Sequence, residues 1–83
     1  MSAIEHLLHV VDRYGDALGL SDATVSTRVF NDGKRVATLR RGGDIGVRSF
    51  ENALTWFSDH WPADASWPAD VPRPTPTNSE AAA

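Results

Sequence analysis

The segment GVRSFENALTWFSDHWP, residues 46–62, carries the most regular apolar pattern in the chain. Large apolar residues recur in it at every third or fourth position, which is the spacing of one face of an α-helix. They are Val47, Phe50, Leu54, Phe57 and Trp61. Pro62 ends the segment because proline lacks the backbone N–H that a helix interior needs. The pattern predicts a core-forming helix over residues 46–61, with Trp56 beside the stripe as a flank of the core.

A second helix is predicted over residues 3–18. Ser2 and Glu5 have the spacing of a capping box, in which each side chain accepts a hydrogen bond from the other residue's backbone N–H. One face of the segment is apolar: Ile4, Leu7, Leu8, Val11, Tyr14 and Leu18. Gly19 follows directly, and glycine commonly ends a helix by taking the left-handed conformation. We expect the two stripes to pack together, with Phe50, Leu54 and Phe57 buried against Leu7, Leu8 and Val11.

The segment between these helices, LGLSDATVSTRVFNDGKR, has two interpretations. In the first it is helical, because Ser21 is a good N-cap and Val25 and Val29 form an apolar stripe four residues apart. This interpretation predicts a helix over residues 21–30. A short helix over residues 33–41 would follow and would be closed by Gly42 and Gly43.

The second interpretation is a β-hairpin. Residues 24–30 alternate, NDG around Asn31–Gly33 is a typical hairpin turn, and KRVATLR would be the return strand. Neither face of this hairpin is cleanly apolar, whereas a helix places Val36 and Leu39 three residues apart on one side. We therefore favour an all-α fold, with a winged helix built around the hairpin as the alternative.

The composition changes after Trp61. All five prolines lie between Pro62 and Pro76, where the imperfect repeat WPADAS and WPADVP is followed by small and polar residues. We expect a compact domain of about four helices in residues 1–61, followed by a Pro-rich strap and flexible tail in residues 62–83. Trp67 is expected to fold back onto the domain.

The length of the chain limits the functions open to it. A domain of 83 residues buries only about 60% of the surface that its unfolded chain exposes, which is too little to enclose a deep substrate cavity. We therefore expect no enzymatic activity and no cofactor. No metal site is expected either, because His6 and His9 would need further ligands from elsewhere. The chain has no cysteine, no leader and no bilayer-length apolar run, which predicts a cytoplasmic protein without membrane contact.

Charge is unevenly distributed along the chain. The net formal charge is −3, yet residues 28–48 contain six basic and two acidic residues and carry +4. The basic residues are Arg28, Lys34, Arg35, Arg40, Arg41 and Arg48. A clustered basic stripe indicates a phosphate-binding face better than total charge does. The alternative is that these are ordinary solvated side chains, which are common on small domains.

The segment YGDALGLSDATVS resembles the helix-turn-helix of phage-repressor and Cro-like DNA-binding proteins. In this resemblance Gly15 is the small residue where two helices cross, Gly19 is the turn, and Ser21 opens the recognition helix. The buried positions would be Leu18, Leu20 and Val25. More loosely, residues 14–62 resemble short helix-turn-helix proteins of phage and bacterial origin. Few residues precede the helix pair, so we expect a variant in which residues 3–18 form one long helix.

The resemblance implies a transcriptional regulator that acts by occupying an operator on double-stranded DNA. In such proteins the recognition helix meets base edges while nearby basic residues bind phosphates. The base contacts carried over are Ser21, Asp22, Ala23, Ser26, Thr27 and Arg28, with Arg28 as a guanine reader. The phosphate contacts are Lys34, Arg35, Arg40, Arg41 and Arg48. One short helix reads few base pairs, so a homodimer is expected.

A different class of function is also compatible with the sequence. The acidic flanks and the tryptophan-rich strap, including Trp56 and Trp67, would suit a small module that binds a protein partner. In that case the arginines would serve only solubility.

Overall fold

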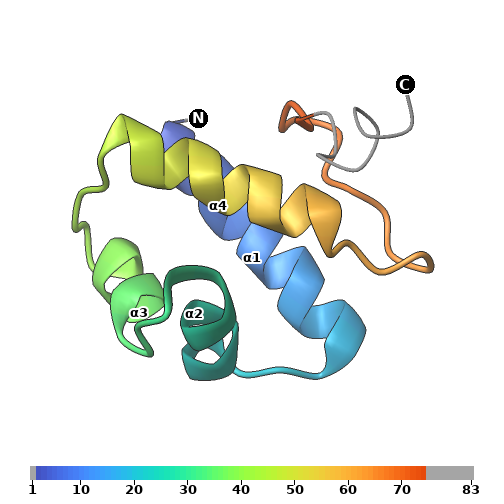
Figure 1. The fold of residues 1–83 in the computed structure, drawn as a ribbon, viewed down its shortest axis with the longest axis horizontal. Coiled ribbons are helices and arrows are strands. Elements are labelled where there is room, and N and C mark those ends of the chain that lie inside the picture. Colours follow the sequence, from blue (N-terminus) through green and yellow to red (C-terminus); the bar gives the residue numbers. More distant parts are fainter. Residues whose placement is uncertain (1, 75–83) are drawn as a thin grey trace.

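The computed structural model describes residues 2–74, which fold into the helices α1 (Ala3–Leu18), α2 (Asp22–Phe30), α3 (Arg35–Arg40) and α4 (Val47–Asp59). In Figure 1, α4 lies across α1, while α2 and α3 lie side by side below them. Residues 2–74 contain no strand, so the fold is all-α and the winged-helix alternative is wrong. The long N-terminal helix has the bounds that the sequence predicts, and the other helices are shorter than predicted by one or two residues at an end.

Both ends of α1 are closed by the residues that the sequence indicates. The Ser2 hydroxyl accepts a hydrogen bond from the Glu5 N–H at 3.2 Å, and the Glu5 carboxylate accepts one from the Ser2 N–H at 3.1 Å. At the other end Gly19 takes the left-handed conformation, with φ of 67°, which a Cβ would disfavour. The chain then turns within three residues into α2, whose N-cap is Ser21.

The NDG segment closes a helix instead of forming a hairpin turn. Asn31 ends α2 in the left-handed conformation, with φ of 57°, and its N–H donates to the Thr27 carbonyl at 2.9 Å. The Asp32 carboxylate then accepts a hydrogen bond from the Lys34 N–H at 2.9 Å, just before α3 begins. Asn and Asp adopt turn conformations between two helices as readily as in hairpins. The NDG segment alone therefore does not distinguish a helix–helix turn from a hairpin.

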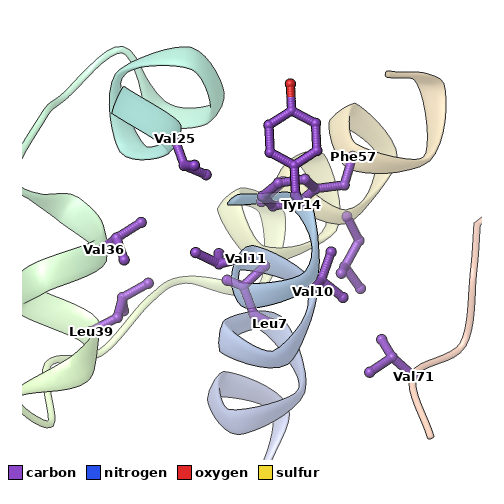
Figure 2. Close-up of a cluster of buried hydrophobic side chains, with 11 residues drawn as sticks. Leu7, Val10, Val11, Tyr14, Val25, Val36, Leu39, Phe57 and Val71 are labelled. Carbon is purple, nitrogen blue, oxygen red and sulfur yellow. The ribbon is translucent and has the colours of Figure 1, made fainter. Parts of the chain in front are cut away.

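The core receives side chains from all four helices (Figure 2). Phe57 of α4 is fully buried, and its ring lies 5.3 Å from that of Tyr14 in an edge-to-face arrangement. Of the residues expected around it, Leu7, Val11 and Leu54 are buried as predicted. Leu8 and Phe50 are only half-buried, whereas Val10, which the apolar stripe omitted, is fully buried.

Two stripe residues are exposed, contrary to prediction. Leu18 is 44% exposed because it is the last residue of α1, where the chain turns away toward α2. Val47, the first residue of α4, is 75% exposed. Val36 and Leu39 of α3 are buried, as the helical interpretation predicts.

Residues 62–74, the described part of the predicted strap, run back along the helices. Trp67 packs on Trp61, with ring centroids 4.8 Å apart, and its indole N–H donates to the Val71 carbonyl at 2.8 Å. Val71 is buried, and Asp70 pairs with His9 of α1 at 3.2 Å. The prediction that Trp67 folds back is therefore confirmed. The tail expected over residues 75–83 lies outside the described residues.

Trp56 flanks the core as predicted. Its ring lies 5.5 Å from that of Tyr14 and stacks on His60 at 4.2 Å. Across residues 2–74, the helices are too short or too polar to cross a membrane.

Candidate nucleic-acid interface

α1 and α2 form a tight helix–turn–helix pair. Gly15 of α1 is buried at their crossing, where an added Cβ would lie 3.1 Å from the Leu20 carbonyl oxygen and 3.7 Å from a methyl group of Val25. The N–H groups of both Gly19 and Leu20 donate to the Gly15 carbonyl. Any side chain at residue 15 would crowd this turn, so Gly15 has the role that the resemblance assigns to it.

One face of α2 is open to solvent. Ala23 and Thr27 lie one helical turn apart on it, and Arg28 follows directly; all three are exposed. Ser21 is exposed at the start of the helix, where its hydroxyl accepts the Thr24 N–H at 3.3 Å. Arg28 donates from Nη1 to the Tyr14 hydroxyl at 3.4 Å, which draws its guanidinium toward α1.

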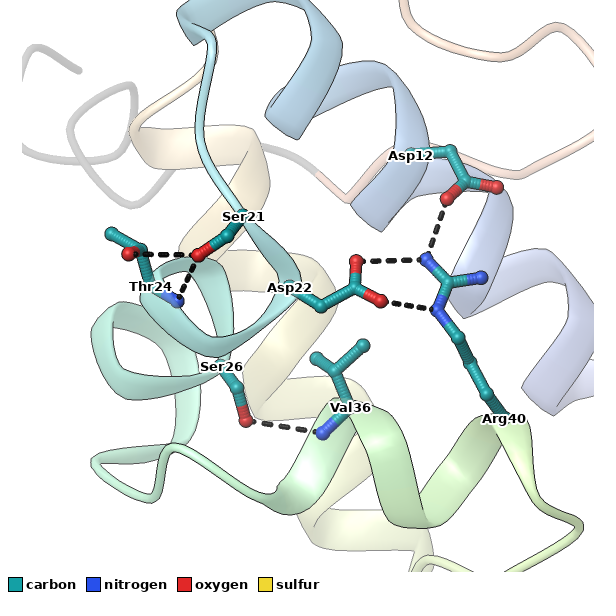
Figure 3. A network of polar contacts seen from close by, with 7 residues as sticks. All are labelled: Asp12, Ser21, Asp22, Thr24, Ser26, Val36 and Arg40. Atoms are coloured by element: carbon teal, nitrogen blue, oxygen red, sulfur yellow. Dashed lines mark hydrogen bonds and ion pairs between the residues drawn. The ribbon is translucent and has the colours of Figure 1, made fainter.

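Asp22 and Arg40 bind one another and do not extend into solvent on their own. Arg40 donates from Nε to Asp22 Oδ2 at 2.8 Å and from Nη2 to Asp22 Oδ1 at 3.1 Å, so the pair is bidentate (Figure 3). The same Nη2 also donates to Asp12 of α1 at 2.6 Å. These bonds, those to Asp22 first, raise the pKa of Arg40 above its ordinary value. The cluster links α1, α2 and α3.

This cluster corrects two predicted roles. The guanidinium of Arg40 is occupied by two carboxylates, so it is not a free phosphate ligand. The Asp22 carboxylate is turned toward Arg40 and its charge is compensated there, so it is not free to accept a hydrogen bond from a base.

Ser26 is a further correction, because its side chain is fully buried and cannot reach a base edge. Its hydroxyl donates to the Asp32 carbonyl and accepts the Val36 N–H at 3.0 Å (Figure 3). Ser26 therefore fixes the turn between α2 and α3. The signal for this was available in the sequence, because Ser26 directly follows Val25 and precedes Val29 by three residues, which places it on the inner face of the helix.

The predicted phosphate-contacting residues differ in exposure and in how near they lie to α2. Lys34 lies in the α2–α3 turn and Arg41 directly follows α3; both are exposed, and neither side chain has an ion pair within residues 2–74. Arg35 is half-buried, with its guanidinium 5.8 Å from the centre of the Phe30 ring. Arg48 is exposed on the first turn of α4, and the start of that helix lies apart from α2 in Figure 1. The structure thus places Lys34 near α2 and separates Arg48 from it.

Thr24 belongs to the exposed start of α2 and was not among the predicted base contacts. Its hydroxyl lies 3.1 Å from that of Ser21. Because it follows Ser21 by three residues, it occupies the position at which an N-cap hydroxyl binds the backbone. That spacing could have identified Thr24 from the sequence as part of the exposed start of α2.

No family model, curated protein or solved structure matches the chain. The resemblance to phage repressors therefore remains a prediction.

Proposed function

We propose that the protein binds double-stranded DNA by inserting α2 into the major groove and regulates transcription by occupying an operator. The observation that carries this proposal is the outer face of α2. It exposes Ala23, Thr27 and Arg28 together, while the neighbouring acidic side chain, Asp22, is compensated by Arg40. A helix whose small residues and one cation face outward fits a groove about 12 Å wide.

Phosphate binding is assigned to the exposed cations around α2. Lys34 precedes α3 and Arg41 follows it, so both ends of this short helix carry positive charge. Such contacts hold a helix in register on the duplex without reading sequence. Arg28 would read guanine because its planar fork matches the O6 and N7 acceptors. A homodimer would double the number of base pairs read.

The dependence of affinity on salt tests this assignment. In fluorescence anisotropy with a duplex selected from a random library, Lys34→Gln and Arg41→Gln are each expected to lower the slope of log affinity against log salt by about one, because each contact releases about one counterion. Arg40→Gln should leave that slope unchanged, because Arg40 is bound to Asp12 and Asp22 and contacts no phosphate, and it should lower the affinity because it frees the charge of Asp22 beside the duplex. Arg13→Gln is the matched control on α1, with the same loss of charge.

Two outcomes would contradict the proposal. One is equal slopes for the wild type, Lys34→Gln and Arg41→Gln. The other is a selection that enriches no sequence while a pull-down recovers a stoichiometric protein partner, which would favour the interaction-module function.

A further inference from the structure

Most hydrogen-bonding groups on the polar side chains of α2 are bound to partners within the protein. The Thr27 hydroxyl donates to the Ala23 carbonyl at 2.9 Å, one turn earlier in the same helix. It also faces the α2–α3 turn, since a Cβ added to Gly33 would lie 3.2 Å from its oxygen. With the hydroxyl directed to the backbone, the methyl group is what the Thr27 side chain presents outward.

The other polar side chains near this face are similarly engaged. The Ser21 hydroxyl caps the helix by accepting the Thr24 N–H, and the Thr24 hydroxyl lies 3.1 Å from it. The Asp22 carboxylate is bound by Arg40, and the Ser26 hydroxyl is buried. What remains for a ligand is the pair of methyl groups on Ala23 and Thr27, followed along the helix by Arg28, whose Nη1 donates to the Tyr14 hydroxyl.

Methyl groups on a helix in the major groove have one specific partner, the C5-methyl group of thymine, which no other standard base carries. Resting on the proposed DNA-binding function, we propose that Ala23 and Thr27 read thymine by methyl–methyl contact. The preferred half-site is then one or two A·T pairs whose thymine methyls face α2, beside a G·C pair read by Arg28. Hydrogen bonding from the hydroxyl of Thr27 plays no part in this recognition.

Replacing thymine by deoxyuridine tests the proposal, because uracil lacks the methyl group and keeps the same hydrogen-bonding edge. The probe is the duplex that the wild-type protein enriches from a random library, with its thymines replaced one at a time. At one or two positions the replacement is expected to weaken binding about fourfold, which is the worth of one buried methyl group. Replacement at the remaining positions should have no effect.

Two variants of Thr27 separate its methyl from its hydroxyl. Thr27→Ser keeps the hydroxyl bond to Ala23 and removes the methyl, so it should bind the thymine duplex about fourfold more weakly and lose sensitivity to one deoxyuridine. Thr27→Val keeps the methyl and removes the hydroxyl, so it should keep both affinity and sensitivity. Circular dichroism of both variants establishes that α2 is folded.

The possible outcomes are distinguishable. Enrichment of no sequence would overturn the DNA-binding function and this inference together. Specific binding in which no deoxyuridine has an effect, or in which Thr27→Ser behaves as the wild type and Thr27→Val does not, would overturn methyl recognition and leave DNA binding standing.

Discussion

Ser26 links α2 to the start of α3 through one hydroxyl group. It holds the Val36 N–H at the start of α3 and the Asp32 carbonyl in the preceding turn, and it does so in a fully buried position. Lys34, the N-cap of α3, makes no side-chain capping bond. Ser26 of α2 therefore supplies the hydrogen-bond acceptor that a backbone N–H at the start of α3 needs. The position of α3 therefore depends on this residue of α2.

Removal of this hydroxyl should destabilise the protein measurably. Ser26→Ala would leave the Val36 N–H buried without a partner, which costs about 1–3 kcal/mol of the free energy of unfolding. Chemical denaturation followed by circular dichroism measures the loss. Ser49→Ala, on the exposed side of α4, is the matched control and should change stability little. Equal stability of the two variants would contradict the role of Ser26.

At the scale of the elements, the helices differ in how much they rely on their own sequence. α1 has 16 residues, a capping box and a glycine stop, so local signals define both of its ends. α3 has six residues, which is far below the length at which an isolated helix is stable in water. It persists because Val36 and Leu39 are buried and Arg40 is bound by carboxylates from α1 and α2.

The capping box of α1 should make stability depend on pH. The pKa of Glu5 is lowered, chiefly because its carboxylate accepts a hydrogen bond from the Ser2 N–H. Its stabilising contribution is therefore fully present above the ordinary glutamate pKa, about 4.3, and is lost as the pH falls through the lowered value.

Thermal unfolding of the wild type and Glu5→Gln from neutral to acidic pH measures this contribution. Glutamine keeps the capping geometry without the charge. The melting temperature of the wild type should exceed that of the variant at neutral pH, and the gap should close in acid. A gap that is constant with pH would show that the charge of Glu5 contributes nothing.

At the scale of the whole molecule, Phe57 lies where the elements meet. It is fully buried, touches the aromatic rings of Tyr14 and Trp56, and belongs to a core cluster that includes residues from every helix and from the strap. Phe57→Ala should cost about 3–5 kcal/mol, because a large aromatic side chain leaves a cavity that the surroundings fill incompletely. In a domain this small, that loss would largely unfold it.

Melting curves of Phe57→Ala and Val47→Ala test the position of the core. Val47 is largely exposed, so its truncation is the matched control and should have little effect on the melting temperature. An unchanged melting temperature in Phe57→Ala would mean that the apolar face of α4 packs differently.

The sequence predicts the helices well because their signals are local, as with Ser2 and Glu5 at the start of α1 and Gly19 at its end. It predicts the candidate interface less well, because side-chain roles there depend on partners far along the chain. Arg40 is 18 residues from Asp22 and 28 from Asp12, and no periodicity in the sequence reports that they meet. Likewise, the choice between Leu8 and Val10 as the buried residue depends on where α4 and the strap approach α1.

The strap has a consequence for how the protein is made on the ribosome. Val71 belongs to the core, and its neighbour Asp70 pairs with His9, 61 residues earlier. Chains emerge from the ribosome N-terminus first, and contacts between distant residues form slowly because long loops must close. α1 thus leaves the exit tunnel well before its last covering residues are synthesised. Until then part of its apolar face stays open to water, and released chains that end before residue 67 should bind chaperones and be cut by proteases more readily than released chains that end after residue 74.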